Sequence, residues 1–172
     1  MDTAVRSTLL QVADVFASRR IGWQLGGSGL LRALGLPDRV RDLDLVFPPE
    51  AAEALVEALD ELTGSRPRLN ARQEPGFVSG WRGRHEVGGV ELDMTSQVTI
   101  ESTSGVVRLP FEEGAAWDLD GRPIPLAPVT HWIVIYRHHN PDRAALLEPM
   151  IDDVEWSSFA DRIGIPSDFG AA

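Results

Sequence analysis

Apolar residues in the first third of the chain recur with helical and strand-like periods in turn. An amphipathic helix is predicted over residues 3–19, because apolar side chains return there every three or four positions. Residues 21–25 ("IGWQL") predict a strand, and residues 28–36 predict a short helix after two glycines. Residues 41–47 ("RDLDLVF") alternate polar and apolar, as a half-buried strand does. Residues 48–64 begin with proline and end with glycine, which predicts another helix.

The middle of the chain predicts strands, and the end predicts helices. A hairpin is expected over 85–94, because Gly88-Gly89 can form a tight turn with positive φ angles. The other strands are expected at residues 76–81, 84–87, 98–102 and 106–111. Helices are expected at 128–139 and 141–154, followed by a short tail from Trp156 whose last residues fray.

This order of elements predicts one α/β (α+β) domain over residues 1–172. A small mixed sheet flanked by helices would occupy residues 1–125, and residues 126–172 would form a short helical extension. The regular strand–helix alternation stops after residue 64, so a doubly wound sheet is not expected.

Composition narrows the classes of function. The net charge of −10 argues against an extended nucleic-acid surface. All 16 basic residues are arginine, which excludes a Walker A loop and a protein-kinase lysine. The absence of cysteine excludes disulfides and thiolate metal sites. No apolar stretch is long enough to span a bilayer and no secretory signal is recognisable, so we expect a cytoplasmic protein that does not bind membranes.

Two polar motifs flank the short helix at 28–36. Gly26, Gly27 and Ser28 lie at its start, where backbone N–H groups, a glycine backbone and a hydroxyl can hold a phosphate. Asp42 and Asp44 lie two positions apart on the next strand and therefore point to the same side. Two such carboxylates repel each other unless a cation lies between them. Together the motifs predict a site for a nucleotide with Mg²⁺.

A third carboxylate follows in the predicted hairpin. Asp93 shares a strand face with Glu91, and it completes a triad with Asp42 and Asp44 if the two strands are neighbours. Asp93 would then bind metal or take a proton from an attacking hydroxyl.

Two other interpretations of these motifs stay open on sequence alone. A dinucleotide-binding loop is a weak match, because the residues after Gly29 are Leu30, Leu31 and Arg32 and the final small residue is missing. An Asp-x-Asp strand is also often only a strand with a solvated polar face.

The motifs together resemble the nucleotidyltransferase superfamily, whose members share a polymerase-β-like palm. The similarity lies in "LGGSGLL", followed after 13 intervening residues from Ser28 by "DLDLVF", with a looser match as far as Asp93. The chain is particularly similar to small antibiotic nucleotidyltransferases that modify aminoglycosides or lincosamides, and to nucleotidyltransferase-fold proteins of toxin–antitoxin systems. A lysine that relatives often carry near the C-terminal helices is absent here, and Arg137 or His138 falls nearby.

The resemblance implies a reaction and a set of roles. An acceptor hydroxyl would attack the α-phosphate of an NTP, and pyrophosphate would leave. Gly26, Gly27 and Ser28 would hold the triphosphate. Asp42, Asp44 and Asp93 would be the catalytic residues and the ligands of Mg²⁺, with two ions present when nucleotide is bound.

Several further residues have candidate roles, and other functions stay open on sequence alone. Arg41 adjoins Asp42 and is a candidate phosphate ligand. Trp81, Trp117 and Trp132 are either ring platforms or core residues. The apolar helix at 128–139 is either buried or packed against a second copy in a homodimer. Alternatives to an enzyme with a small hydroxyl-bearing acceptor are a non-catalytic regulatory or antitoxin-like protein, and a transferase acting on tRNA or protein.

Overall fold

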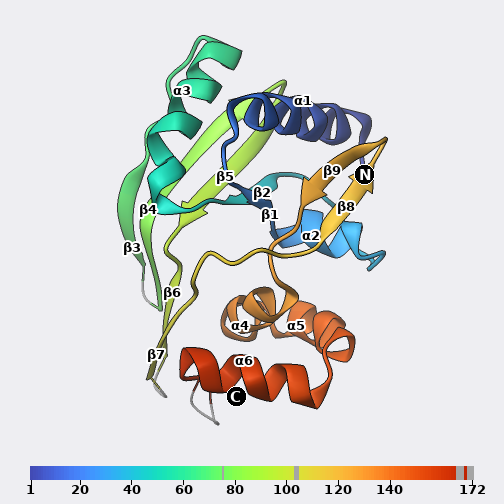
Figure 1. Ribbon diagram of the computed structural model, residues 1–172, viewed down its shortest axis with the longest axis vertical. Helices are drawn as coiled ribbons and strands as arrows, with labels where there is room; N and C mark the ends of the chain where they lie inside the picture. The colour runs from blue at the N-terminus through green and yellow to red at the C-terminus, as the bar shows by residue number, and fades with distance from the viewer. Residues whose placement is uncertain (75, 103–104, 166–168, 170–172) are drawn as a thin grey trace.

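The fold combines one mixed sheet with six α-helices (Figure 1). The computed structural model describes residues 1–74, 76–102, 105–165 and 169. The helices are α1 (Thr3–Arg19), α2 (Gly27–Ala33), α3 (Ala52–Thr63), α4 (Val129–His139), α5 (Pro141–Leu147) and α6 (Asp153–Ile163), with short 3-10 helices η1 (Pro49–Ala51) and η2 (Glu148–Met150). The strands are β1 (Gln24–Leu25), β2 (Leu43–Val46), β3 (Asn70–Glu74), β4 (Phe77–Val87), β5 (Val90–Ser96), β6 (Thr99–Ser102), β7 (Gly105–Arg108), β8 (Ala116–Leu119) and β9 (Arg122–Pro125).

Seven strands form the main sheet in the order β1-β2-β5-β4-β6-β7, with β3 on β4. The pairing of β2 with β5 is parallel, and the remaining pairs in this sheet are antiparallel. Strands β8 and β9 form a separate hairpin. The mixed sheet flanked by helices confirms the predicted fold class.

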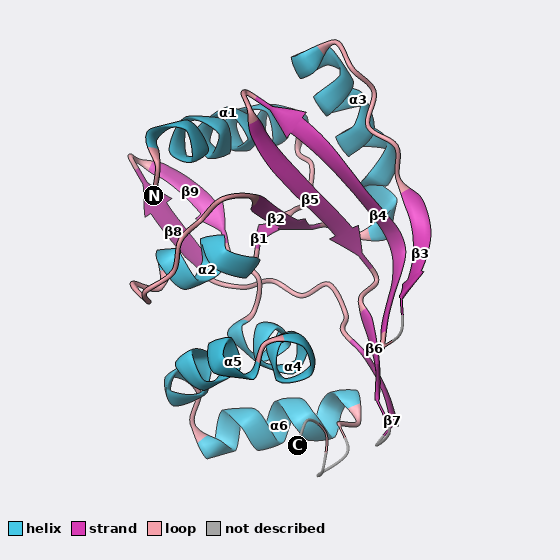
Figure 2. Cartoon of the chain, turned by 180° about the vertical axis from the view of Figure 1, so that it is seen from behind, coloured by secondary structure: helices cyan, strands magenta, loops and turns pink. Residues whose placement is uncertain are grey.

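Two groups of helices lie on either side of the sheet's central region, and α2 lies between them beside β2 (Figures 1 and 2). Helices α1 and α3 lie together at one end, and α4, α5 and α6 gather at the other end, beside β6 and β7. The apolar face of α1 is buried, and the Phe16 ring meets Trp23 edge-on at 5.7 Å. One end of the sheet therefore faces the C-terminal helices α4, α5 and α6.

Several local predictions are confirmed by the residues that begin and end the elements. Asp2 caps α1 by accepting a hydrogen bond from the Ala4 amide at 2.8 Å. Gly64 ends α3 with φ +70°. Gly88 and Gly89 make the hairpin turn with φ +58° and +80°. The predicted strands at 76–81 and 84–87 are one continuous strand, β4.

The sequence did not predict strands β3, β8 and β9 or helix α6. The edge strand β3 and the β8–β9 hairpin lie in segments where the apolar–polar alternation is weak. The prediction of a short tail from Trp156 was wrong, because α6 runs through it to Ile163. Asp152 begins this helix by accepting from the Glu155 amide at 2.8 Å, and Gly164 ends it with φ +69°.

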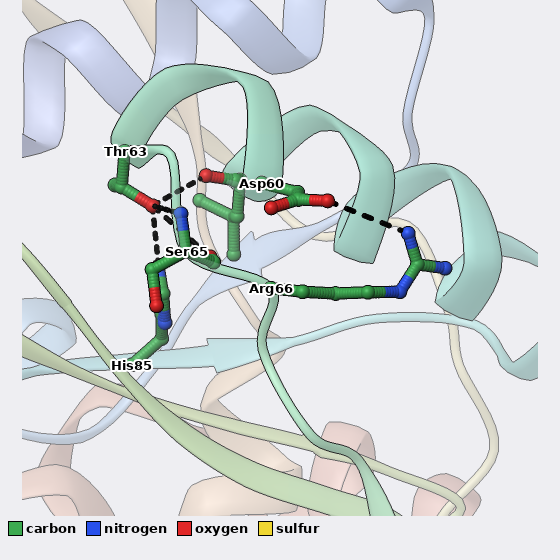
Figure 3. Close-up of polar contacts among 6 residues, drawn as sticks. Asp60, Thr63, Ser65, Arg66 and His85 are labelled. Atoms are coloured by element: carbon green, nitrogen blue, oxygen red, sulfur yellow. Dashed lines mark hydrogen bonds and ion pairs between the residues drawn. The ribbon is translucent and has the colours of Figure 1, made fainter.

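The end of α3 is tied to the sheet by the polar contacts shown in Figure 3. Thr63 Oγ1 and His85 Nε2 are hydrogen-bonded at 2.9 Å, and Arg66 pairs with Asp60 at 3.6 Å. Burial lowers the pKa of His85. His85 therefore has a structural role, attaching α3 to β4.

Helix α4 is buried along most of its length, which resolves one of the alternatives left by the sequence. Residues 130–136 are all buried within this chain. His131 is among them, and its Nε2 lies 3.6 Å from Glu112 Oε2. Burial lowers the pKa of His131 to about 4. The helix is thus covered without a second subunit.

The depressed pKa of His131 predicts a loss of stability in mild acid. Below the ordinary pKa of 6.5 the unfolded chain binds a proton at this position, whereas the folded chain does not until the pH approaches 4. We expect the free energy of unfolding to fall by about 2 kcal/mol between pH 7 and pH 5 on this account. Urea unfolding of wild type and His131→Gln at both pH values measures it. Equal losses in the two proteins would contradict the assignment.

Candidate active site

A cleft of about 380 Å³ lies between the sheet and helices α4 and α5. Strands β2, β4 and β5 provide one wall, and the helices provide the other. The lining side chains are Asp44, Val46, Phe77, Arg82, Asp93, Thr95, Val98, Trp132, Ile135, Tyr136, His139, Asn140 and Arg143. Two of the three predicted carboxylates therefore face one cavity.

The register of two parallel strands brings these carboxylates together. Asp44 of β2 is the direct partner of Asp93 of β5. The neighbouring Leu43 and Leu92 point to the opposite side and are fully buried, which fixes the register through the hydrophobic core. Asp42 comes one residue before β2 and is half-buried. The condition under which Asp93 could join Asp44, adjacency of the two acidic strands, is thus met.

The loop formed by Gly26 and Gly27, which we call the glycine loop, lies directly against Asp44. The Gly26 amide donates to the Asp44 carbonyl oxygen at 2.8 Å. Gly27 has φ +53°, and a Cβ atom there would overlap the Asp44 carboxylate. Ser28 is buried, and its Oγ has no hydrogen-bond partner among the described residues. The two sequence motifs therefore form one site, with an unused hydroxyl in it.

Trp132 of α4 covers the other side of the loop. A Cβ atom on Gly26 would overlap the Trp132 indole, so only glycine lets the helix approach this closely. Trp132 is 7% exposed, and its Nε1 lacks a partner within the described part of the chain. Of the three tryptophans considered, this one lines the cleft, whereas Trp81 is exposed on β4.

The electrostatics of the cleft centre on Asp44. Burial is the main cause that raises the pKa of this carboxyl to about 7, and the negative charges of Asp42 and Asp93 contribute to the same shift. Arg143 and the Ser28 backbone N–H act in the opposite direction. Three carboxylates thus share one region in which ionising the central one is costly, and a cation would lower that cost.

Asp93 is held by two arginines of the neighbouring strand. Arg82 Nε lies 3.2 Å from Asp93 Oδ1, and Arg82 Nη2 lies 2.9 Å from Oδ2. Arg84 Nε is 3.5 Å from Oδ2. Within the described residues, no group of three His, Cys, Asp or Glu side chains is arranged to hold a metal ion. The bidentate contact with Arg82 explains why Asp93 is turned toward β4 here.

Arg143 of α5 is a cleft residue that the sequence did not identify. Its Nη2 lies 2.8 Å from Asp38 Oδ2, and its guanidinium stands 5.5 Å from the centre of the Tyr136 ring. Arg143 thus connects the helical end to the loop that leads into Asp42. The predicted phosphate ligand Arg41 is exposed and borders a different surface hollow, beside Arg39. Arg137, near the expected lysine position, instead pairs with Glu148 at 2.8 Å.

Comparison with known proteins identifies the fold through structural similarity. No protein-family model matches the sequence, and no curated protein matches it significantly. Solved structures do match. A Thermotoga maritima protein classed as a nucleotidyltransferase aligns over 84% of this chain and 90% of its own, with a TM-score of 0.67 and 16% identity. The chain has the nucleotidyltransferase fold.

An antibiotic-resistance factor shares this nucleotidyltransferase fold. The crystal structure of ANT(2'')-Ia in complex with adenylyl-2''-tobramycin covers 93% of this chain and 99% of its own, with a TM-score of 0.61 and 16% identity. A solution structure of the same factor covers 95% of each chain, with a TM-score of 0.62 and 18% identity. These matches confirm the resemblance to the superfamily and its antibiotic-modifying members at the level of the fold.

Proposed function

We propose that this protein is a Mg²⁺-dependent nucleotidyltransferase that moves an NMP group from an NTP to a hydroxyl of a small-molecule acceptor. The observation that carries the proposal is that Asp44 and Asp93 lie directly opposite each other on paired strands. Gly27, which precedes Ser28, lies against the Asp44 carboxylate. The full-length fold similarity to nucleotidyltransferases, one of them bound to an adenylylated antibiotic, supports it. With this activity the protein would act in the cytoplasm.

The residues of the cleft suit Mg²⁺ and a triphosphate. Asp42, Asp44 and Asp93 offer hard oxygen donors, and burial together with the charges of Asp42 and Asp93 makes ionised Asp44 costly unless a cation binds. These three residues would hold two ions when nucleotide is bound. The bound ions would neutralise charge on the reacting phosphates. The unpartnered Ser28 Oγ, together with Gly26 and Gly27, would receive the phosphate oxygens.

The chain's own groups would then carry the reaction. The acceptor oxygen forms a bond to the α-phosphorus while the bond from that phosphorus to the β-phosphate oxygen breaks, and pyrophosphate leaves with the electron pair. The proton of the acceptor hydroxyl passes to Asp93, or to water if Asp93 serves as a ligand only. Arg143, placed beside Asp44 and Tyr136, adds positive charge on the nucleotide side of the cleft.

Nucleotide binding tests the proposal before any acceptor is known. An NTP at about 100 times its dissociation constant, with Mg²⁺, should stabilise the folded protein by about 2.7 kcal/mol. For a domain of this size, that is a rise in melting temperature of roughly 5–10 °C. Removing Mg²⁺ with EDTA should abolish the rise. If millimolar NTP with Mg²⁺ leaves the melting temperature unchanged, the proposed function is wrong.

A further inference from the structure

A second cavity, larger than the candidate active site, lies where the sheet meets the end of α6. Its volume is about 1050 Å³, at the upper end of the range for small-molecule sites. Residues of β3, β4, β6, β7 and α6 line it, and the C-terminal end of α6 lies beside β7 in both views (Figures 1 and 2). Among the described residues, Val98 alone also lines the cleft that contains Asp44. We call this second space the Arg108 cavity.

The pairing of three strands brings Arg108 to the cavity. Val78 of β4 pairs with Thr99 of β6, and Thr99 pairs with Arg108 of β7. Directly opposite residues share one face of a sheet, so these three side chains form a row along one wall. Their neighbours Ile100 and Val107 are fully buried on the other face, which fixes this register.

The charge of Arg108 has no partner in the described part of the chain. Arg108 is exposed, and no hydrogen bond or ion pair joins it to another described residue. Arg162 also lines the cavity, but both of its terminal nitrogens are hydrogen-bonded to the Glu112 carboxylate. None of the described lining residues is an Asp or a Glu. The cavity therefore offers one unpaired guanidinium in a chain whose net charge is −10.

Much of the remaining wall is apolar. The Phe111 side chain is 37% exposed, and Leu109 and Ile163 line the same space. An apolar ligand would cover these side chains and remove their surface from water. Ser79 lines the cavity too, and its buried Oγ has no hydrogen-bond partner among the described residues. The cavity thus combines one free cation, one unused hydroxyl and an apolar surface.

We propose that the Arg108 cavity binds a small organic acid, an apolar compound that carries one carboxylate. A guanidinium binds a carboxylate through two parallel hydrogen bonds. One unpaired arginine matches a single negative charge, whereas a phosphate group carries nearly two at neutral pH and would be only partly neutralised. Phe111, together with the neighbouring apolar side chains, would bury the rest of the ligand. This site goes beyond the proposed function, because it uses neither Asp44 nor Asp93.

Titration calorimetry with a matched series of probes tests the site. The probes 4-phenylbutyrate, 4-phenylbutanol and 4-phenylbutylamine share one apolar body and differ in charge. With the full chain in EDTA at neutral pH, we expect the acid to bind about tenfold more tightly than the alcohol, and the amine to bind most weakly. Equal affinities of acid and alcohol, or no saturable binding of the acid at millimolar concentration, would overturn the proposal. Because no nucleotide is present, neither outcome bears on the proposed function.

Variants at the cavity locate the binding. Arg108→Gln should erase the preference for the acid over the alcohol, and Arg108→Lys should retain part of it. Phe111→Ala should weaken both probes to a similar degree, because it removes apolar contact and leaves the charge. Arg66→Gln is the matched control and should change neither affinity, because Arg66 is exposed and lies outside the described lining. If the preference persists in an Arg108→Gln protein that thermal unfolding shows to be folded, the proposal is wrong.

Discussion

Replacing Asp44 by asparagine is expected to abolish nucleotidyl transfer and, at the same time, to stabilise the metal-free protein at pH 8. Activity should fall ~10³-fold or more, because the proposed central metal ligand is lost. Stability should rise because the charge of Asp44 is costly in the fold. Its folded pKa of about 7 stands above the ordinary value of 3.8. The cost is therefore absent below pH 3.8, grows between pH 3.8 and 7, and is complete above pH 7.

The size of this gain follows from the pKa shift. Asparagine keeps the shape of the side chain and removes the charge, so the free energy of unfolding at pH 8 should increase by roughly 2–4 kcal/mol. At pH 4 the gain should be small. Thermal unfolding of both proteins at the two pH values in EDTA measures it, and labelled NTP measures turnover.

A distant aspartate provides the control for this experiment. Asp161 is exposed on α6, and Asp161→Asn should change neither stability nor turnover by a measurable amount. Asp44→Asn that destabilises the metal-free protein at pH 8 would contradict the electrostatic account. Full turnover in that variant would contradict the catalytic role of Asp44.

Gly27→Ala is expected to disrupt the site and much of the local fold. Gly27 adopts φ +53°, which costs an alanine about 1–2 kcal/mol, and the new methyl group would overlap the Asp44 carboxylate. The overlap forces either the loop or Asp44 to move. We expect a total destabilisation of at least about 3 kcal/mol and loss of Mg²⁺-dependent nucleotide binding.

Gly35→Ala is the matched control, since Gly35 has φ +79° and nothing within 4 Å of a built Cβ. That variant has the backbone cost alone, about 1–2 kcal/mol, and should keep nucleotide binding. Urea unfolding and calorimetry of the pair separate backbone strain from the contact with Asp44. If the two variants lose equal stability and both bind nucleotide, the close approach of Gly27 to Asp44 has no functional role.

The sequence predicted the core of the candidate site because its parts are local. Alternation on one short strand gives Asp42 and Asp44 a common side, and glycines before a helix mark the loop beside them. From the sequence, Asp93 could join Asp44 only if their two strands were neighbours. The parallel pairing of β2 with β5 makes them neighbours and sets the two residues directly opposite each other. Such a pairing depends on the whole sheet and on the buried leucines that set its register.

Arg82 and Arg143 could not be identified from the sequence for the same reason. Arg82 reaches Asp93 because β4 and β5 form an antiparallel pair, and Arg143 reaches Asp38 across the space between α5 and the α2–β2 loop. No short motif encodes either contact. Helix α6 did carry a local signal, since Asp152 and Glu155 have the spacing of a capping box, but few apolar residues follow. Its single buried residue, Phe159, gives little periodicity to detect.

The raised pKa of Asp44 links the fold to the proposed reaction. A chain selected for stability alone would not place Asp42 and Asp93 beside the buried Asp44, because both raise the cost of ionising Asp44. A bound cation offsets this electrostatic cost of ionising Asp44. When metal and nucleotide bind, their free energy of binding stabilises the folded protein.

A crystal structure of the protein grown with Mn²⁺ and a non-hydrolysable ATP analogue tests the central claim most directly, because the anomalous signal of Mn²⁺ locates the metal unambiguously. The account predicts metal bound by Asp44 together with Asp42 or Asp93, the phosphates against Gly27 and Ser28, and Asp93 released from its bidentate contact with Arg82. A metal-free cleft with the analogue bound elsewhere, and Asp93 still paired with Arg82, would contradict it.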